Sequence, residues 1–443
     1  MTLIFVTSIL TLAGYNFVAF LHERISTAEK ISTGFLFSSG LFISLCFPIG
    51  LFSQSFRPLN LLILSILIYL LSAALKHFLT EKHQSESEIT ANNKITKIGG
   101  LIVGIILLSS FITNLYWPVR DWDAITLYDF RGRLFAAEGS ISPTMYSMEP
   151  NYYLAYPFFT SLAHTSIYVL SNYSPVVYYS VITAAFCLSF YHILKRKTNS
   201  TAAIIGTILL ISTFDIYSHS LISYTNLPYV IYIFLGLIYS YEAKKDLKIY
   251  LLSAVFVAIS CAIRSDDPFW AIALALSVYY AVIHKKISII PLYVIIILSW
   301  KLPWSIYKER VLADYVTAIS TNYPGYSAVI PVIIEKWWSR AIEVSKFLLD
   351  KVLWYYNNYL AFLVLSSILA FSLKLKNTYL SKFVIVSFVA ILSAGTYALS
   401  FVYYKWDQVG GSAQRMMMIL IPFIIYDAMI TIYSYLNSKR ILP

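Results

Sequence analysis

Residues 98–135 read IGGLIVGIILLSSFITNLYWPVRDWDAITLYDFRGRLF. The first half, up to Trp117, is apolar and long enough to cross a lipid bilayer, which takes about 20 residues. The second half is densely charged, although only 12% of the whole chain is charged. Its charged residues are Arg120, Asp121, Asp123, Asp129, Arg131 and Arg133. The stretch marks the edge of a membrane span, and its charges are either interfacial anchors or part of an active site.

The composition of the whole chain places it in a membrane. Of its 443 residues, 58% are hydrophobic, and the mean hydropathy is +0.69. A water-soluble domain of this size needs many more charged residues on its surface. We therefore predict an all-α polytopic membrane protein with about thirteen transmembrane helices. The predicted spans are 2–21, 34–53, 59–76, 98–117, 176–194, 201–214, 227–241, 248–264, 268–284, 287–301, 353–373, 381–402 and 416–436.

Sidedness follows from Lys and Arg, because cytoplasmic loops of membrane proteins collect positive charge. The loops predicted to be cytoplasmic are 77–97, 195–197, 244–248, 284–286, 374–376 and 439–440. Alternation then places on the external face the loops 118–156, 215–226, 265–267, 302–352 and 403–415. Residues 157–171 are apolar, but a span there would invert every later loop, so we predict a juxtamembrane or re-entrant helix on the external side. Charged and apolar residues alternate at helical spacing in loop 302–352, which predicts further helices along the membrane.

The predicted organisation is three leading spans with a polar cytoplasmic loop, residues 1–97, followed by a catalytic membrane module, residues 98–443. The net charge of +11 is explained by the basic loops, and no soluble basic module supports nucleic-acid binding. Cys46, Cys187 and Cys261 lie in apolar runs, which argues against a disulfide or a zinc site. The first 20 residues lack a basic n-region and a cleavage site, so we expect a retained span.

Asp121, Asp123 and Asp129 are candidates for proton-transfer chemistry. A carboxylate at a membrane boundary is partly desolvated, which raises its pKa and makes it a better general base. The alternative is that these acids pair with the neighbouring arginines. Arg131 and Arg133 suit phosphate recognition, since a guanidinium can donate two parallel hydrogen bonds, or they anchor the stretch at the interface. Two positions apart, they point to different sides of a helix.

Two further segments carry an arginine at the end of a predicted span. In CAIRSDDPFW (261–270), Asp266 and Asp267 favour the start of the next helix, but this account leaves Arg264 unexplained. In KWDQVGGSAQRMMMILIPF (405–423), Arg415 is predicted to open an apolar helix, where a cation opposes the positive end of the helix dipole. An anionic lipid phosphate would supply the partner of such an arginine.

Other polar residues carry weaker signals. His164 and His219 are predicted to be external, but they match no spaced set of metal ligands, so a metal site built on them is a minor alternative. Asp427 lies inside the last predicted span, where hydrogen bonding within the bundle and a functional role are both open. The chain has no Walker A, GxGxxG, GxSxG or CxxC motif.

Residues 122–133, WDAITLYDFRGR, follow an early span and resemble the WDAWAIWxLKAR loop of the GT-C superfamily of integral membrane glycosyltransferases. The resemblance is to the bacterial branch related to protein O-mannosyltransferases and aminoarabinose transferases, with Arg131 in place of a lysine. The other similar segments are Tyr156–Pro157, Tyr224–Pro228, Arg264–Asp267, and Ser412–Arg415 followed by Pro422. The chain departs from the family pattern in having Asn226 and Gln414 at two acidic positions, and three spans before the loop.

The resemblance implies a GT-C-like fold and the transfer of a sugar from a polyprenyl-phosphate donor to a lipid, glycan or protein acceptor. Asp123 would deprotonate the acceptor, while Arg131, Arg264 and Arg415 would hold the donor phosphate, whose negative charge grows as it leaves. Direct attack would invert the anomeric carbon. The remaining substrate-binding candidates are Asp121, Arg133, Tyr156, Asn226, Asp266, Asp267 and Gln414. No cofactor is implied with certainty, and a divalent metal is left open.

The expected location is a prokaryotic cytoplasmic membrane, with the site on its external face. A transporter or flippase and a polymerase or ligase of lipid-linked glycans are the alternatives, with a structural scaffold as the remainder. A transporter is expected to place charges near the bilayer midplane and to show inverted repeats. Nearly all ionisable residues of this chain fall instead in predicted loops, and no repeat is apparent in the sequence.

Overall fold

The computed structural model describes residues 1–79, 94–141, 156–243, 246–265, 267–312, 326–355, 357–373, 379–402, 407 and 410–438. Contacts within the chain divide it into two compact units. The first contains Met1–Glu149 and Tyr156–Lys308, and the second contains Pro150–Ala155 and Glu309–Pro443. The division predicted between residues 97 and 98 falls within the first unit and remains a prediction.

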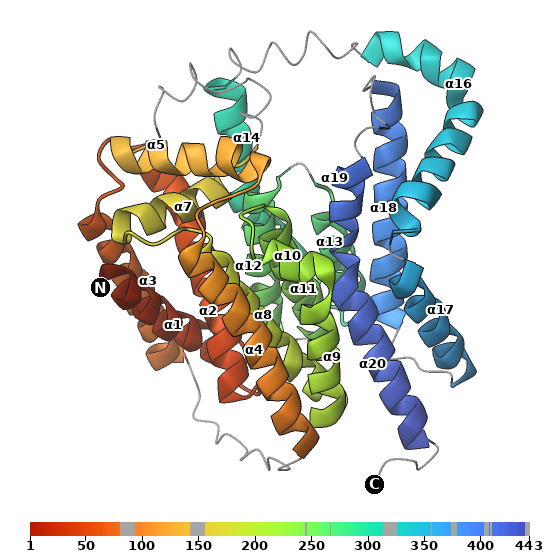
Figure 1. Ribbon diagram of the computed structural model, residues 1–443, viewed down its shortest axis with the longest axis horizontal. Helices are drawn as coiled ribbons and strands as arrows, with labels where there is room; N and C mark the ends of the chain where they lie inside the picture. The colour runs from red at the N-terminus through yellow and green to blue at the C-terminus, as the bar shows by residue number, and fades with distance from the viewer. Residues whose placement is uncertain are drawn as a thin grey trace. The chain divides into compact units, whose positions relative to one another are not determined.

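The first unit is a bundle of helices (Figure 1). Its helices are α1 (Thr2–Leu21), α2 (Thr27–Gly50), α3 (Pro58–Leu79), α4 (Lys94–Tyr116), the π-helix η1 (Ala124–Asp129), α5 (Phe130–Glu138), α7 (Phe159–Leu170), α8 (Val177–Lys195), α9 (Ser200–Ser212), α10 (Phe214–His219), α11 (Asn226–Ala243), α12 (Leu247–Ile263), α13 (Trp270–Ile283) and α14 (Ile289–Arg310). Polar side chains cap several of these helices: Ser26 accepts a hydrogen bond from the backbone of Glu29, and Asn199 accepts one from Ala202.

The second unit is also helical. Its helices are α16 (Tyr326–Phe347), the π-helix η3 (Leu348–Leu353), α17 (Asn357–Ser372), α18 (Tyr379–Val402), α19 (Gly410–Met417) and α20 (Leu420–Ser438). Helix α20 packs against α17 and α18. The described part of the predicted loop 302–352 is therefore largely helical, as its spacing of charged and apolar residues predicted.

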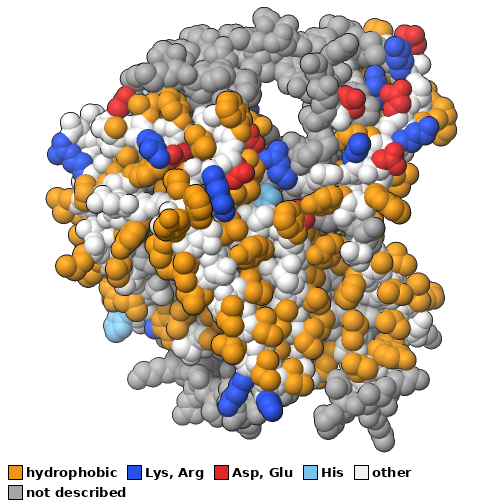
Figure 2. All heavy atoms as spheres, in the orientation of Figure 1, with side chains coloured by type: hydrophobic (Ala, Val, Ile, Leu, Met, Phe, Trp, Pro, Cys, Tyr) orange, Lys and Arg blue, Asp and Glu red, His pale blue; other side chains and the backbone are white. Residues whose placement is uncertain are grey.

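The chain is an all-α polytopic membrane protein. Within the described ranges, 8 helices are long and apolar enough to cross a membrane, or 9 if the bent pair 333–353 and 358–372 forms one span. The 8 helices lie at Thr2–Leu21, Thr27–Gly50, Pro58–Phe78, Lys94–Tyr116, Val177–Lys195, Ile289–Arg310, Ser381–Ala398 and Gln414–Ser438. On the first unit, Figure 2 shows hydrophobic side chains along the sides of the helices and charged side chains toward their ends.

Every apolar run that the sequence marked as a span is helical in the structure, although several of these helices are shorter than a bilayer requires. The largest difference in bounds is at α14, which continues nine residues past the predicted end at 301, through Pro303 to Arg310. The extension is held by aromatic packing, since the rings of Trp304 and Tyr307 lie against Phe47 and Phe158. Ring packing thus makes this part of the predicted loop a continuation of the bundle.

Helix α7 confirms the predicted helix within 157–171, and its burial fits the re-entrant alternative better than a helix on the membrane surface. Apart from Tyr168 and Val169, all of its residues are buried. It packs against α2 and α5. The small and hydroxyl-bearing residues Thr160, Ser161 and Ala163 allow this close packing on several sides, which an amphipathic surface helix does not need.

The side-chain amide of Asn114 holds the C-terminal end of α4 against neighbouring helices. Nδ2 of Asn114, which carries two hydrogens, lies within hydrogen-bond distance of three acceptors: the carbonyl of Val176 at 3.1 Å, the hydroxyl of Ser180 at 2.7 Å and the carbonyl of Ser220 at 2.7 Å. These partners belong to the start of α8 and the end of α10. Since Asn114 precedes Trp117 by only three residues, the chain leaves α4 in a defined direction.

The two ends of the first unit have different charges. At the start of α2, Arg196 pairs with both Glu29 and Glu242, and Lys197 lies 3.5 Å from Glu242. At the other end of α2, the carbonyl of Gly50 accepts a hydrogen bond from the backbone of Ile141, which follows α5. A helix of 24 residues is about 36 Å long. The basic segment 195–197 and the charged stretch before α5 therefore lie at opposite ends of α2, as the predicted sidedness requires.

A close helix crossing gives a test of the packing of the first unit. Gly14 of α1 and Gly34 of α2 touch through their backbones, and a Cβ at Gly14 would overlap the carbonyl of Gly34. We expect Gly14→Ala to destabilise the purified protein by about 1–3 kcal/mol, because the crossing must separate. Thermal unfolding in detergent measures the change. Gly104→Ala is the control, since a Cβ there meets nothing within 4 Å, and an equal loss in both variants would contradict the crossing.

Candidate functional site

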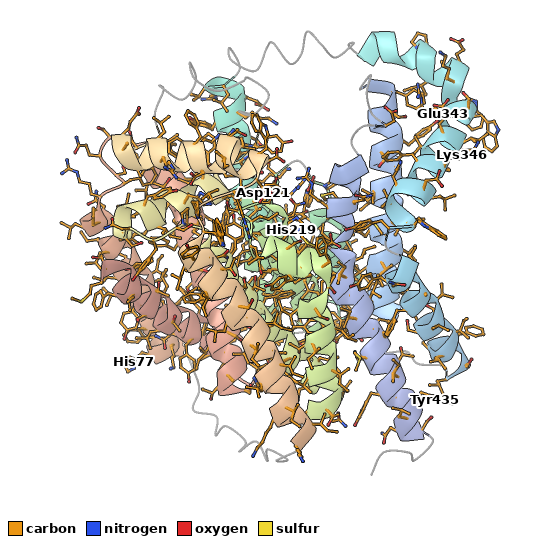
Figure 3. The ribbon with its side chains drawn as sticks, in the orientation of Figure 1. His77, Asp121, His219, Glu343, Lys346 and Tyr435 are labelled. Carbon is orange, nitrogen blue, oxygen red and sulfur yellow. The ribbon has the colours of Figure 1, made fainter. Side chains whose placement is uncertain are left out.

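The charged stretch after α4 folds into a turn followed by two joined helices. Asp121 adopts a positive φ of 74°, a conformation that Asp tolerates better than most residues, and its carbonyl accepts a hydrogen bond from the backbone of Ile125. Asp123 is the half-buried N-cap of η1. Figure 3 shows Asp121 and His219 toward one end of the first unit and His77 toward the other. The proposed base, Asp123, thus lies at the entrance of η1 and not within a long flexible loop.

Arg131 and Arg133 point to different sides of α5, as their spacing predicted. Arg131 is fully buried, donates from Nη1 to the carbonyl of Tyr156 at 3.3 Å, and lies 5.2 Å from the ring centroid of Phe158. The side chain of Arg133 is 65% exposed. The helical period therefore divides the two cations between the interior and the surface, and only Arg131 belongs to the core of the site.

Asp129 is the centre of a hydrogen-bonded cluster, in which its pairing with Arg133 matches the alternative kept open from the sequence, whereas its contacts with His164 and Tyr168 were not predicted. Its Oδ1 accepts from His164 Nδ1 at 3.1 Å and from the Tyr168 hydroxyl at 2.5 Å, and its Oδ2 accepts from Arg133 at 2.7 Å. Burial of Asp129 raises its pKa, but the bonds from His164, Tyr168 and Arg133 outweigh that effect and hold the pKa below its usual range. The signal was present as two i,i+4 pairs, Asp129–Arg133 and His164–Tyr168.

Tyr128 connects three of the segments that the family resemblance singled out. Its hydroxyl lies 3.4 Å from Oγ1 of Thr225, and it interacts electrostatically with both Arg131 and Arg264. Burial raises the pKa of Tyr128, so the phenol stays protonated. Arg131 and Arg264, which are far apart in the sequence, therefore both lie close enough to the buried phenol of Tyr128 to interact with it electrostatically.

The turn after α12 supplies Arg264 and Asp267. Arg264 is the C-cap of α12, where a cation is favoured by the helix dipole, and its Nε donates to Asp267 at 2.5 Å. Its guanidinium also lies 5.9 Å from the ring centroid of Tyr229. Lys301 donates to the carbonyl of Ser265, which ties the turn to α14. Asp266 lies outside the described residues.

The segment 224–228 opens α11 and packs against the charged stretch. Asn226 is the first residue of α11 and is buried. Tyr224 packs against Val119, Ala124 and Val176. Together with the contact between Tyr128 and Thr225, this packing places Asn226 next to the segment that contains Asp123.

The last two candidates belong to the second unit and are described within it. Gln414 and Arg415 lie on α19, and the Gln414 amide donates to the carbonyl of Lys351. Arg415 lies in the last turn of α19, and a short turn joins α19 to α20, which begins at Leu420. The segment Gln414–Ser438 is apolar and long enough to cross a membrane, so Arg415 lies at the start of the last span, as predicted.

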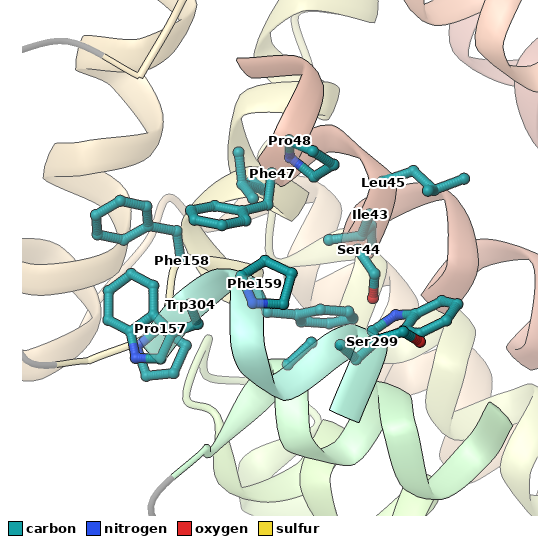
Figure 4. Close-up of a pocket in the computed structure, with 14 residues that line it drawn as sticks. Ile43, Ser44, Leu45, Phe47, Pro48, Pro157, Phe158, Phe159, Ser299 and Trp304 are labelled. Atoms are coloured by element: carbon teal, nitrogen blue, oxygen red, sulfur yellow. The ribbon is translucent and has the colours of Figure 1, made fainter. Parts of the chain in front are cut away.

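An apolar cavity lies beside the buried arginine in the first unit. It is lined by residues of α2, α7, α12 and α14, and Figure 4 shows the rings of Phe47, Phe158 and Trp304 around it. Phe158 lines the cavity and also stacks against Arg131. The guanidinium of Arg131 therefore lies over the ring of a residue that lines the cavity. Within the described ranges, no group of three or more His, Cys, Asp or Glu residues could hold a metal ion.

The comparisons with known proteins identify no relative of this chain. Protein-family models, curated proteins and solved structures were each compared with it, and none matches. Support for a function therefore comes from the residues themselves and from the contacts that they make within each unit.

The cluster around Asp129 predicts a pH dependence of stability. Burial holds the pKa of His164 below its ordinary value of 6.5, although Asp129 acts in the opposite direction. The unfolded chain therefore binds this proton at a higher pH than the folded protein, and stability falls as the pH drops below about 6.5. The lowered pKa of Asp129 adds a further loss only below its ordinary value of 3.8.

We expect the melting temperature of the wild type in detergent to fall more steeply between about pH 7.5 and about pH 5 than that of His164→Asn. The asparagine amide can still donate to Asp129 but does not titrate. His77→Asn is the control, since His77 is exposed on α3 and should leave the slope unchanged. Equal slopes for the wild type and His164→Asn would show that His164 does not titrate on unfolding.

Proposed function

We propose that the chain is a GT-C-like membrane glycosyltransferase with about thirteen transmembrane helices, and that it transfers a sugar from a polyprenyl-phosphate donor to an acceptor on the external face. The observation that carries the proposal is the convergence of Arg131 and Arg264 on Tyr128, together with the contact between Tyr128 and Thr225. Three segments that resemble family motifs, and that are remote in the sequence, meet at one end of the first unit. Two arginines from different elements suit a phosphate that leaves with its negative charge.

The apolar cavity supports a donor with a long hydrocarbon chain. Sites for apolar ligands are concave and lined by aromatic and aliphatic side chains, with a few polar groups that fix the orientation. The cavity has such walls in Phe47, Phe158 and Trp304, and the guanidinium of Arg131 lies over the ring of Phe158. In this proposal the prenyl chain occupies the cavity, and its phosphate extends toward Arg131 and Arg264.

Among the three carboxylates of the stretch, Asp123 is the best candidate for the base. Asp129 accepts three hydrogen bonds that lower its pKa, and a carboxylate of low pKa is a poor general base. Asp129 is better suited to hold η1 and α5 in place. Asp123, the N-cap of η1, would take the proton of the acceptor hydroxyl as that oxygen attacks the anomeric carbon, and the lipid phosphate would leave with the bonding pair.

The role of Asp123 is tested by Asp123→Asn in a reconstituted assay with a radiolabelled polyprenyl-phosphate sugar. We expect transfer to fall by at least about a hundredfold, with unchanged expression and melting temperature, because only the basic group is removed. Glu138→Gln is the matched control, since it makes the same change at an exposed carboxylate of α5. Normal turnover by Asp123→Asn would refute the assigned base.

The role of the arginines is tested by Arg264→Gln and Arg415→Gln. Each is expected to raise the KM for the donor lipid by about tenfold or more and to leave the KM for the acceptor near the wild-type value, because charge-assisted bonds to phosphate are lost. Arg120→Gln is the control, since Arg120 is exposed in the same stretch as Asp123. Equal losses for donor and acceptor would remove the phosphate-binding role of the residue concerned.

A further inference from the structure

One carboxyl group of the second unit is buried in the apolar interior of a spanning helix. Asp427 lies in the middle of α20 and is fully buried, as are its neighbours Tyr426 and Ala428. Burying an isolated ionised carboxylate in apolar surroundings costs far more free energy than burying its neutral form. The contacts of Asp427 therefore decide which of the two forms the folded protein holds.

The partner of Asp427 Oδ2 is the hydroxyl of Ser366, which also lies near a backbone carbonyl and has only one hydrogen to donate. Oγ of Ser366, on α17, lies 3.1 Å from Asp427 Oδ2 and 3.0 Å from the carbonyl oxygen of Leu363. A serine hydroxyl carries a single hydrogen, and a carbonyl oxygen can only accept. Both contacts are full hydrogen bonds only if Ser366 donates to Leu363 and Asp427 donates to Ser366. That arrangement requires a proton on Asp427.

The surroundings of the other carboxyl oxygen, Oδ1, also favour a protonated Asp427. Asp427 Oδ1 is buried, and no hydrogen-bond donor lies within reach of it among the residues that the structure describes. An ionised carboxylate would leave this oxygen charged and uncompensated, whereas a neutral acid leaves only an unpaired carbonyl oxygen. Thr431, one turn further along α20, is also buried with its Oγ1 unpaired in the described part of the chain. Its hydroxyl therefore does not compensate a negative charge either.

The charged groups that face Asp427 are few. Helices α17 and α20 carry no other Asp, Glu, Lys, Arg or His residue. On α18, Lys382 in the first turn is the only such residue, and it interacts electrostatically with Asp427. Among the described residues of these three helices, only Lys382 could form an ion pair that compensates an ionised Asp427, and this pairing can be tested directly.

We infer that Asp427 is a proton-binding site, a carboxylic acid that holds its proton in mildly acidic conditions and donates a hydrogen bond to Ser366, joining α20 to α17. The link holds in place the helix that follows Arg415. The inference concerns the second unit and holds whether or not the chain transfers sugars. Its ligand is the proton, and removal of that proton would place an uncompensated charge between the two helices.

Infrared spectroscopy of the full-length protein in detergent tests the inference, because a protonated carboxylic acid has a carbonyl stretch that an ionised carboxylate lacks. At mildly acidic pH we expect a band that is lost in Asp427→Asn and shifted in Ser366→Ala, where its hydrogen-bond acceptor is gone. Asp350→Asn is the matched control, since Asp350 is exposed on η3, and the band should remain in that variant.

Three outcomes would overturn the inference. The first is the absence of a band that Asp427→Asn removes. The second is a band that appears only in Lys382→Met, which would show that an ion pair holds Asp427 ionised in the wild type. The third is a band that disappears when sodium chloride replaces choline chloride at constant pH, which would show that the site binds a monovalent cation in place of the proton.

Discussion

The carboxylate of Asp129 is the interaction on which the candidate site depends. It is buried, and a buried charge is tolerated only when hydrogen-bond donors surround it. His164 and Tyr168 supply two of these donors from α7, and Arg133 supplies the third from α5. Removal of any one would leave part of the charge unsatisfied, so the two helices keep a fixed relation, and the backbone of η1 is fixed with them.

This arrangement also explains why α7 and α5 approach so closely. Gly132 lies between the two arginines of α5, and a Cβ there would come within 2.5 Å of the Cβ of His164. The absence of a side chain at Gly132 lets α5 lie directly on α7, with Arg133 directed to the cluster and Arg131 to the interior. The same contact therefore sets the geometry of Asp129 and the burial of Arg131.

Polar groups elsewhere in the chain follow the same rule. The hydrogen bonds of the Asn114 amide direct the chain out of α4, and the pairing of Arg196 with Glu29 and Glu242 joins helices at the opposite end of the first unit. Such groups are costly inside an apolar bundle unless they are satisfied, so each one specifies which helices must meet. Asp427 extends the rule, because there a bound proton takes the place of a charged partner.

The sequence by itself determined the class of the protein and the positions of its helices, because apolar length and helical spacing are local properties that one segment reveals alone. It also predicted that Arg131 and Arg133 face different sides, which needs only the helical period. Only the tertiary structure decided that Asp129 meets His164, that Tyr128 meets Thr225, and that α7 is buried. These contacts join residues 35 and 97 positions apart, and no local pattern encodes which distant helices pack together.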